Sequence, residues 1–143
     1  MRPYANTVFT ASQLDLFETI RRCVTSVPHT HGHDDPSCHE LARAVGRQFG
    51  LPVVDGHYLL GFEHSWLDVD GHVLDVYPIG HAGYSISPIL VDRHIAKFTA
   101  LHSGSMVYSL YDGSRKPRGV DRVRVDIVRE IQQRIMSVQR ESR

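Results

Sequence analysis

Cys38 is the residue in this chain whose surroundings most favour reactive chemistry. It follows Pro36 and Ser37, and proline and serine are both favoured at the start of a helix. A thiol in the first helical turn lies beside unpaired backbone amides and the positive end of the helix dipole, which stabilise its ionised form. At this position the sequence allows either a nucleophilic thiol or a structural cysteine, which is the more common case at a helix start. Cys23 lies on an apolar helical stripe instead and is expected to be a buried, inert thiol.

A histidine and a carboxylate further along the chain are predicted to share one face of a hairpin. Asp70-Gly71 is a strong two-residue turn signal between two strand-like segments. Such a turn pairs Val69 with His72, and it makes His64 and Asp75 diagonal neighbours about 7–8 Å apart. A carboxylate there would hold the imidazole tautomer, and the other ring nitrogen would exchange a proton with a thiol.

These residues resemble a known family, the transglutaminase-like branch of the papain-like superfamily. That branch typically shows a cysteine at a helix start, a histidine followed two residues later by tryptophan, and an aspartate just before a turn that contains proline. Here the matching segments are Cys38, His64-Ser65-Trp66 and Leu74-Asp75-Val76-Tyr77-Pro78, so the resemblance covers residues 36–78.

The resemblance implies a papain-like or transglutaminase-like fold and a Cys-His-Asp triad. Cys38 would be the nucleophile, His64 the general base and acid, and Asp75 the orienting residue. It implies a thiol hydrolase or acyltransferase acting on an amide or thioester bond of a peptide or protein, as a peptidase, deamidase or transamidase. No cofactor is expected. Trp66 and Tyr77 share the predicted site face and are candidate substrate-binding residues.

Two other readings of the sequence stay open. One is a papain-like domain that binds a partner without catalysis. The other is a zinc-dependent hydrolase, because imidazole, carboxylate and thiolate groups crowd into the segment 29–39, with His29, His31 and His33 as the first candidate ligands. The order of these residues matches no metallohydrolase motif that we considered, so the thiol hypothesis is preferred and no metal is expected. Ser37 and Ser65 lack the Gly-x-Ser-x-Gly elbow of a serine hydrolase.

Hydrophobic periodicity predicts the elements that must position these residues. Apolar residues at helical spacing predict helices over Ser12–Val27, from Pro36-Ser37-Cys38 to Gly50, and over Val120–Val138. Between them, strands are expected at Val53-Val54, Tyr58–Leu60, Trp66–Val69, His72–Tyr77 and Met106–Tyr111, a loop at Gly80–Pro88, and a helix or strand at Asp92–Leu101. This order predicts one α+β domain over residues 1–143, with N-terminal helices packed on a small antiparallel sheet and a C-terminal helix.

Composition excludes several functional classes. The chain has zero formal net charge, 41% hydrophobic residues and no window long enough for a membrane-spanning helix, so no membrane partner is expected. Residues 115–143 are basic, but no aromatic residues interleave with them, and nucleic acid is not an expected partner. Two cysteines are too few for a disulfide framework, and the first residues lack the apolar core of a signal peptide. The expected location is cytoplasmic, or that of a leaderless secreted effector; the oligomeric state stays open.

Overall fold

The computed structural model describes residues 9–27, 35–58, 62–77, 88–92, 108–110 and 118–141. These residues form an α+β arrangement, as predicted. The strands make one five-stranded sheet in the order β4-β3-β2-β1-β5, and each neighbouring pair is antiparallel. The elements are α1 (Ala11–Val24), α2 (Cys38–Phe49), β1 (Val53–Tyr58), β2 (Phe62–Val69), β3 (His72–Asp75), β4 (Ile89–Val91), β5 (Tyr108–Leu110), α4 (Arg118–Asp121) and α5 (Val125–Glu141).

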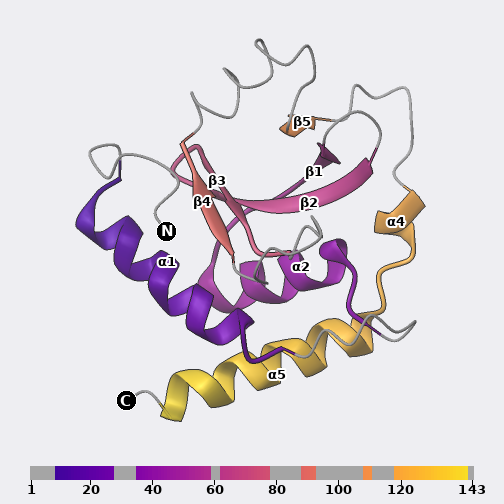
Figure 1. Cartoon of the computed structure of the whole chain (residues 1–143). Helices are drawn as coiled ribbons and strands as arrows, with labels where there is room; N and C mark the ends of the chain where they lie inside the picture. The colour runs from indigo at the N-terminus through magenta and orange to yellow at the C-terminus, as the bar shows by residue number, and fades with distance from the viewer. Residues whose placement is uncertain are drawn as a thin grey trace, which may run out of the picture.

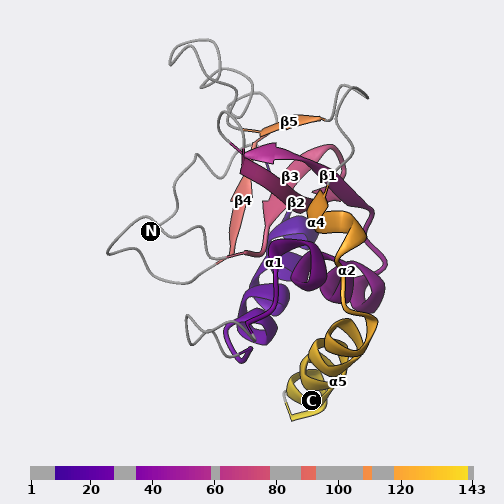
Figure 2. The same ribbon diagram turned by 90° about the vertical axis from the view of Figure 1, so that its right-hand side faces the viewer.

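Helix α2 lies between the sheet and α5, and α1 lies beside it (Figures 1 and 2). Helix α2 contacts β2 on one side and α5 on the other, so it is buried along most of its length. Among the described helices none is long and apolar enough to cross a membrane. The side chains completely excluded from solvent at the centre of this core are those of Ile20, Leu41, Ala42, Ala44, Val45, Leu67, Leu74 and Ile135.

The start of α2 is defined by a reciprocal cap. Ser37 Oγ accepts the backbone N–H of Glu40 at 3.2 Å, and Glu40 Oε1 accepts the backbone N–H of Ser37 at 2.9 Å. This capping box satisfies two of the amides that a helix end leaves unpaired. Cys38 is therefore the first helical residue, as predicted from its neighbours.

The hairpin between β2 and β3 has the predicted register. Asp70 and Gly71 both adopt positive φ angles, 52° and 86°, as expected for the two central residues of a type I′ turn. Val69 pairs with His72 and Leu67 with Leu74. Because side chains alternate along a strand, Leu67 and Leu74 point into the helical core. The opposite face, called the site face below, carries His64, Trp66 and Asp75.

Several elements differ from the sequence prediction. Val53-Val54 and Tyr58, which were expected in two strands, belong to the single strand β1, and β2 begins at Phe62 instead of Trp66. Strand β4 was not predicted, because its three apolar residues are too short a run to show a period. The helix expected over Val120–Val138 is instead divided into α4 and α5. Arg124 interrupts it: its backbone N–H donates to Glu40 Oε2 at 2.7 Å, and its carbonyl accepts the N–H of Val128 to begin α5. The segments Gly80–Pro88 and Asp92–Leu101 lie almost wholly outside the described residues.

We expect the contact between Glu40 and Arg124 to contribute strongly to stability. The Glu40 side chain is 1% exposed and its Oε2 accepts from Arg124 Nε at 2.9 Å. Arg124→Met leaves this buried carboxylate without its cation, so the free energy of unfolding should fall by about 2–3 kcal/mol. Arg122→Met, at an exposed position two residues away, is the matched control and should change it by less than about 0.5 kcal/mol. Urea unfolding measures both; equal losses would contradict this role for Arg124.

Candidate active site

The Cys38 thiol lies where the first turn of α2 meets β2. Its Sγ is 3.9 Å from the backbone oxygen of Glu63, the residue before His64. The thiol is partly exposed, whereas the Cys23 side chain is 2% exposed in the core, as predicted for an inert thiol. Strand β3 ends at Asp75 and pairs with β2 over Leu67–Val69. Glu63, which the thiol contacts, therefore lies on the part of β2 that extends past the end of β3.

His64 and Asp75 are in direct contact, which confirms their predicted common face. His64 Nε2 lies 2.8 Å from Asp75 Oδ2. The same oxygen accepts the Tyr108 hydroxyl at 2.8 Å, and Oδ1 accepts the backbone N–H of Tyr77 at 3.1 Å. Asp75 is completely buried, so these donors hold the carboxylate in one position. Because Nε2 is bonded to Asp75, Nδ1 is the ring nitrogen that remains for the Cys38 thiol.

The surroundings of Cys38 and His64 favour their ionised forms. Burial opposes ionisation of Cys38, but hydrogen bonding with the His39 and His64 side chains, and the charges of those rings, lower its pKa to about 6. Burial likewise opposes protonation of His64, but hydrogen bonding with Asp75 and Cys38, and their negative charges, raise its pKa to about 9. Between these two values the pair exists as thiolate and imidazolium, the reactive form of a cysteine nucleophile.

Four aromatic rings surround the His64 imidazole. The ring centroids of Tyr58, Trp66, Tyr77 and Tyr108 lie 5.6, 6.3, 6.0 and 6.4 Å from that of His64. Trp66 is only 5% exposed and packs edge-on against Tyr108, so it supports the imidazole and has little surface left for a substrate. Tyr77 is half-buried, and burial and the charge of Cys38 raise its pKa. Of the two residues proposed to bind substrate, Tyr77 is the better placed.

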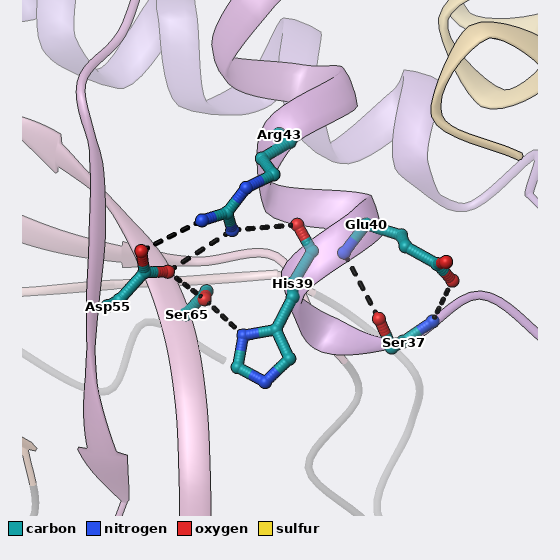
Figure 3. Close-up of polar contacts among 6 residues, drawn as sticks. All are labelled: Ser37, His39, Glu40, Arg43, Asp55 and Ser65. Atoms are coloured by element: carbon teal, nitrogen blue, oxygen red, sulfur yellow. Dashed lines mark hydrogen bonds and ion pairs between the residues drawn. The ribbon is translucent and has the colours of Figure 1, made fainter. Parts of the chain in front are cut away.

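Several residues at this site were not assigned to it from the sequence. Tyr108 comes from β5, far along the chain from Asp75. His39 lies directly after Cys38, yet its ring reaches Ser65 on β2, with Nδ1 2.6 Å from the serine Oγ (Figure 3). The only sequence signal for the contact between His39 and Ser65 is that they directly follow Cys38 and His64, respectively.

The three histidines named as first candidate ligands of the alternative metal site lie outside the described residues, whereas Asp35, Cys38 and His39 of the same segment are described. His29, His31 and His33 belong to the segment 28–34, which the structure does not describe. Within the described segments, no group of three or more His, Cys, Asp or Glu side chains is arranged to hold a metal ion.

Cys38 should show the pH dependence of an ionised thiol. Because its pKa is about 6, the rate of alkylation by iodoacetamide should rise through a midpoint near pH 6 and stay high at pH 7. Cys23, whose pKa burial raises, should be modified only after unfolding. Peptide mapping of the labelled protein distinguishes the two thiols, with Cys38→Ser as the control. A midpoint near the ordinary thiol pKa, or preferential labelling of Cys23, would contradict the assignment of Cys38.

Replacement of Asp75 by Asn should weaken the stabilisation of the Cys38 thiolate by His64. The amide keeps the shape of the side chain, but it removes the charge that stabilises protonated His64. We expect the apparent pKa of Cys38 to rise by about one unit or more. Asp92→Asn is the matched control and should leave the pKa of Cys38 unchanged. Asp92 is a buried carboxylate directly after β4, near the start of β3 and away from Asp75 at its end. Unchanged alkylation kinetics in the Asp75→Asn protein would mean that Asp75 has a structural role only.

The chain was compared with known proteins at three levels. No model of a protein family, no curated protein and no solved structure matches it. A functional proposal for this chain therefore depends on the geometry and electrostatics of the site.

Proposed function

We propose that this protein is a cysteine hydrolase or acyltransferase of papain-like or transglutaminase-like architecture, acting on an amide or thioester bond. The observation that carries the proposal is the buried His64–Asp75 contact at 2.8 Å together with a cysteine in the first turn of α2 whose pKa is about 6. The arrangement of α2 against an antiparallel sheet whose neighbouring strands carry the histidine and the aspartate also supports it.

The first half of the reaction forms an acyl-enzyme. The Cys38 thiolate attacks the carbonyl carbon of the substrate, and the charge that develops on the carbonyl oxygen needs hydrogen-bond donors. The backbone N–H groups of Cys38 and His39 are candidates, because first-turn amides have no acceptor within the helix and the cap engages that of Glu40. Protonated His64 gives its proton to the leaving amine or thiolate as the bond to carbon breaks.

The second half releases the acyl group. Neutral His64 takes a proton from water, or from an amine in a transfer reaction, as that nucleophile attacks the thioester. The carbon–sulfur bond then breaks, its electron pair returns to Cys38, and the thiolate–imidazolium pair is restored. Asp75 keeps Nε2 engaged throughout, so that Nδ1 remains the nitrogen that gives a proton to the leaving group and takes one from the second nucleophile. A peptide or protein is the proposed substrate, with Tyr77 beside the reacting group.

Trapping of the acyl-enzyme tests this proposal. The protein is incubated at pH 7.5 with a panel of peptide aminocoumarin amides, glutamine-containing peptides and peptide thioesters, then quenched with acid. Intact-mass spectrometry should show one acyl group on Cys38, absent from Cys38→Ser and retained in Cys23→Ala. His64→Gln should slow product formation by about 10²–10⁴-fold.

Two outcomes would contradict the proposal. Absence of acylation and turnover across the panel, with Cys38 still alkylated at its low pKa, would favour a binding domain without catalysis. Turnover that persists in Cys38→Ser but disappears with a zinc chelator and in His31→Ala would favour the metal-dependent alternative.

A further inference from the structure

A second chain of hydrogen bonds ends at His39, the residue after Cys38, on the helix-facing side of β2. Arg43 donates to both carboxylate oxygens of Asp55, at 3.1 and 2.8 Å. Asp55 Oδ1 accepts the Ser65 hydroxyl at 2.5 Å, and Ser65 Oγ lies 2.6 Å from His39 Nδ1 (Figure 3). The triad proposed above uses none of these four residues for proton transfer.

The direction of each hydrogen bond in this chain can be deduced. The Arg43 guanidinium is always a donor. Although burial raises the pKa of Asp55, hydrogen bonds from Arg43 and Ser65 lower it below its usual value, so this carboxylate is ionised and only accepts. The Ser65 hydroxyl donates its hydrogen bond to Asp55. The Ser65 oxygen must therefore accept the hydrogen bond that it shares with His39. His39 Nδ1 is therefore the donor to Ser65, and the ring can stabilise a neighbouring negative charge only as an imidazolium, because the neutral ring carries no proton on Nε2.

The His39 ring is held from two sides. It is 3% exposed, and its partner Ser65 is completely buried. On the other edge Gly119 approaches so closely that a Cβ atom at that position would lie 2.3 Å from Nε2. Glu63 holds Gly119 there, since its carboxylate accepts the backbone N–H groups of Arg118 at 2.9 Å and of Gly119 at 2.8 Å.

Consecutive residues on two elements bring this ring to the nucleophile. Cys38 and His39 are neighbours in the first turn of α2, and His64 and Ser65 are neighbours on β2. Because alternate side chains of β2 point to opposite faces, His64 contacts Asp75 on the site face while Ser65 contacts His39 on the helix face. Two imidazoles are thus oriented near the start of α2: His64 directly by Asp75, and His39 by Ser65, whose hydroxyl is held by Asp55.

We propose that His39 is a second imidazole acting on the Cys38 thiol, and that Ser65, Asp55 and Arg43 are positioning residues that hold its tautomer and orientation. The role assigned to His39 in turnover rests on the proposed hydrolase function. His64 supplies the proton to the leaving group, and His39, as an imidazolium whose Nδ1–H is accepted by Ser65, stabilises negative charge on the sulfur. It would do so when the electron pair returns to sulfur as the carbon–sulfur bond of the acyl-enzyme breaks. Hydrogen bonding with both rings lowers the pKa of Cys38, in agreement with this division of roles.

The pKa of Cys38, measured from the pH dependence of alkylation, tests the proposal without any substrate. Ser65→Ala and His39→Gln should each raise it by about 0.5–1 unit, which means alkylation about three- to tenfold slower at pH 5. The charged groups around the two rings, Asp75, Glu63 and Asp55, are unchanged in both proteins. Ser26→Ala, which removes a hydroxyl bonded to the backbone of α1, is the matched control and should leave the pKa unchanged.

The double variant separates a role of Ser65 in positioning His39 from a general loss of stability. If Ser65 acts through His39, adding Ser65→Ala to His39→Gln should raise the pKa no further. Asp55→Asn keeps the shape of a partly exposed side chain and should give the same shift as Ser65→Ala, even if the latter folds poorly. A lowered melting temperature with an unchanged pKa in Ser65→Ala and Asp55→Asn, or additive shifts in the double variant, would overturn the proposal. Loss of the proposed turnover function alone would leave these pKa shifts intact.

Discussion

The geometry of the candidate site depends on the hydrogen bonds that the Glu40 carboxylate accepts from Ser37 and Arg124. This carboxylate is almost completely buried, and it accepts hydrogen bonds from the Ser37 amide and from the backbone and side chain of Arg124. Burial raises its pKa, but the bonds from Arg124 and Ser37 lower it below the usual value, so the group stays ionised. It fixes the first turn of α2 and also the point where α5 begins. The position of the Cys38 thiol follows from both.

Strand β2 divides the polar residues of the site between its two faces. His64 and Trp66 point to the site face with Asp75, while Ser65 points to α2 and Leu67 to the apolar core. The same strand thus holds the general base, supports its ring and anchors the His39 contact. A substitution that shifts the register of β2 by one residue would exchange the two faces, which would separate His64 from the thiol and Ser65 from His39.

Burial and charge act in opposite directions on the reacting pair, and charge prevails. Removing Cys38 and His64 from water favours their neutral forms, as for any buried ionisable group. Each supplies the opposite charge that the other needs, and Asp75 adds a negative charge held by three donors. The four aromatic rings pack around His64, which is buried, and so limit the access of water to it. Thiolate and imidazolium are therefore the stable forms near neutral pH.

The sequence by itself determined the local features that depend on near neighbours. Ser37 marked the helix start at Cys38, and Asp70-Gly71 set a register that brought His64 and Asp75 onto one face, because caps and two-residue turns depend on adjacent residues. Only the tertiary structure brought His39 to Ser65, Tyr108 to Asp75 and Arg124 to Glu40. These contacts join residues 26, 33 and 84 positions apart. No period or spacing encodes them, since they arise from the packing of α5 on α2, of α2 on β2 and of β5 against β1.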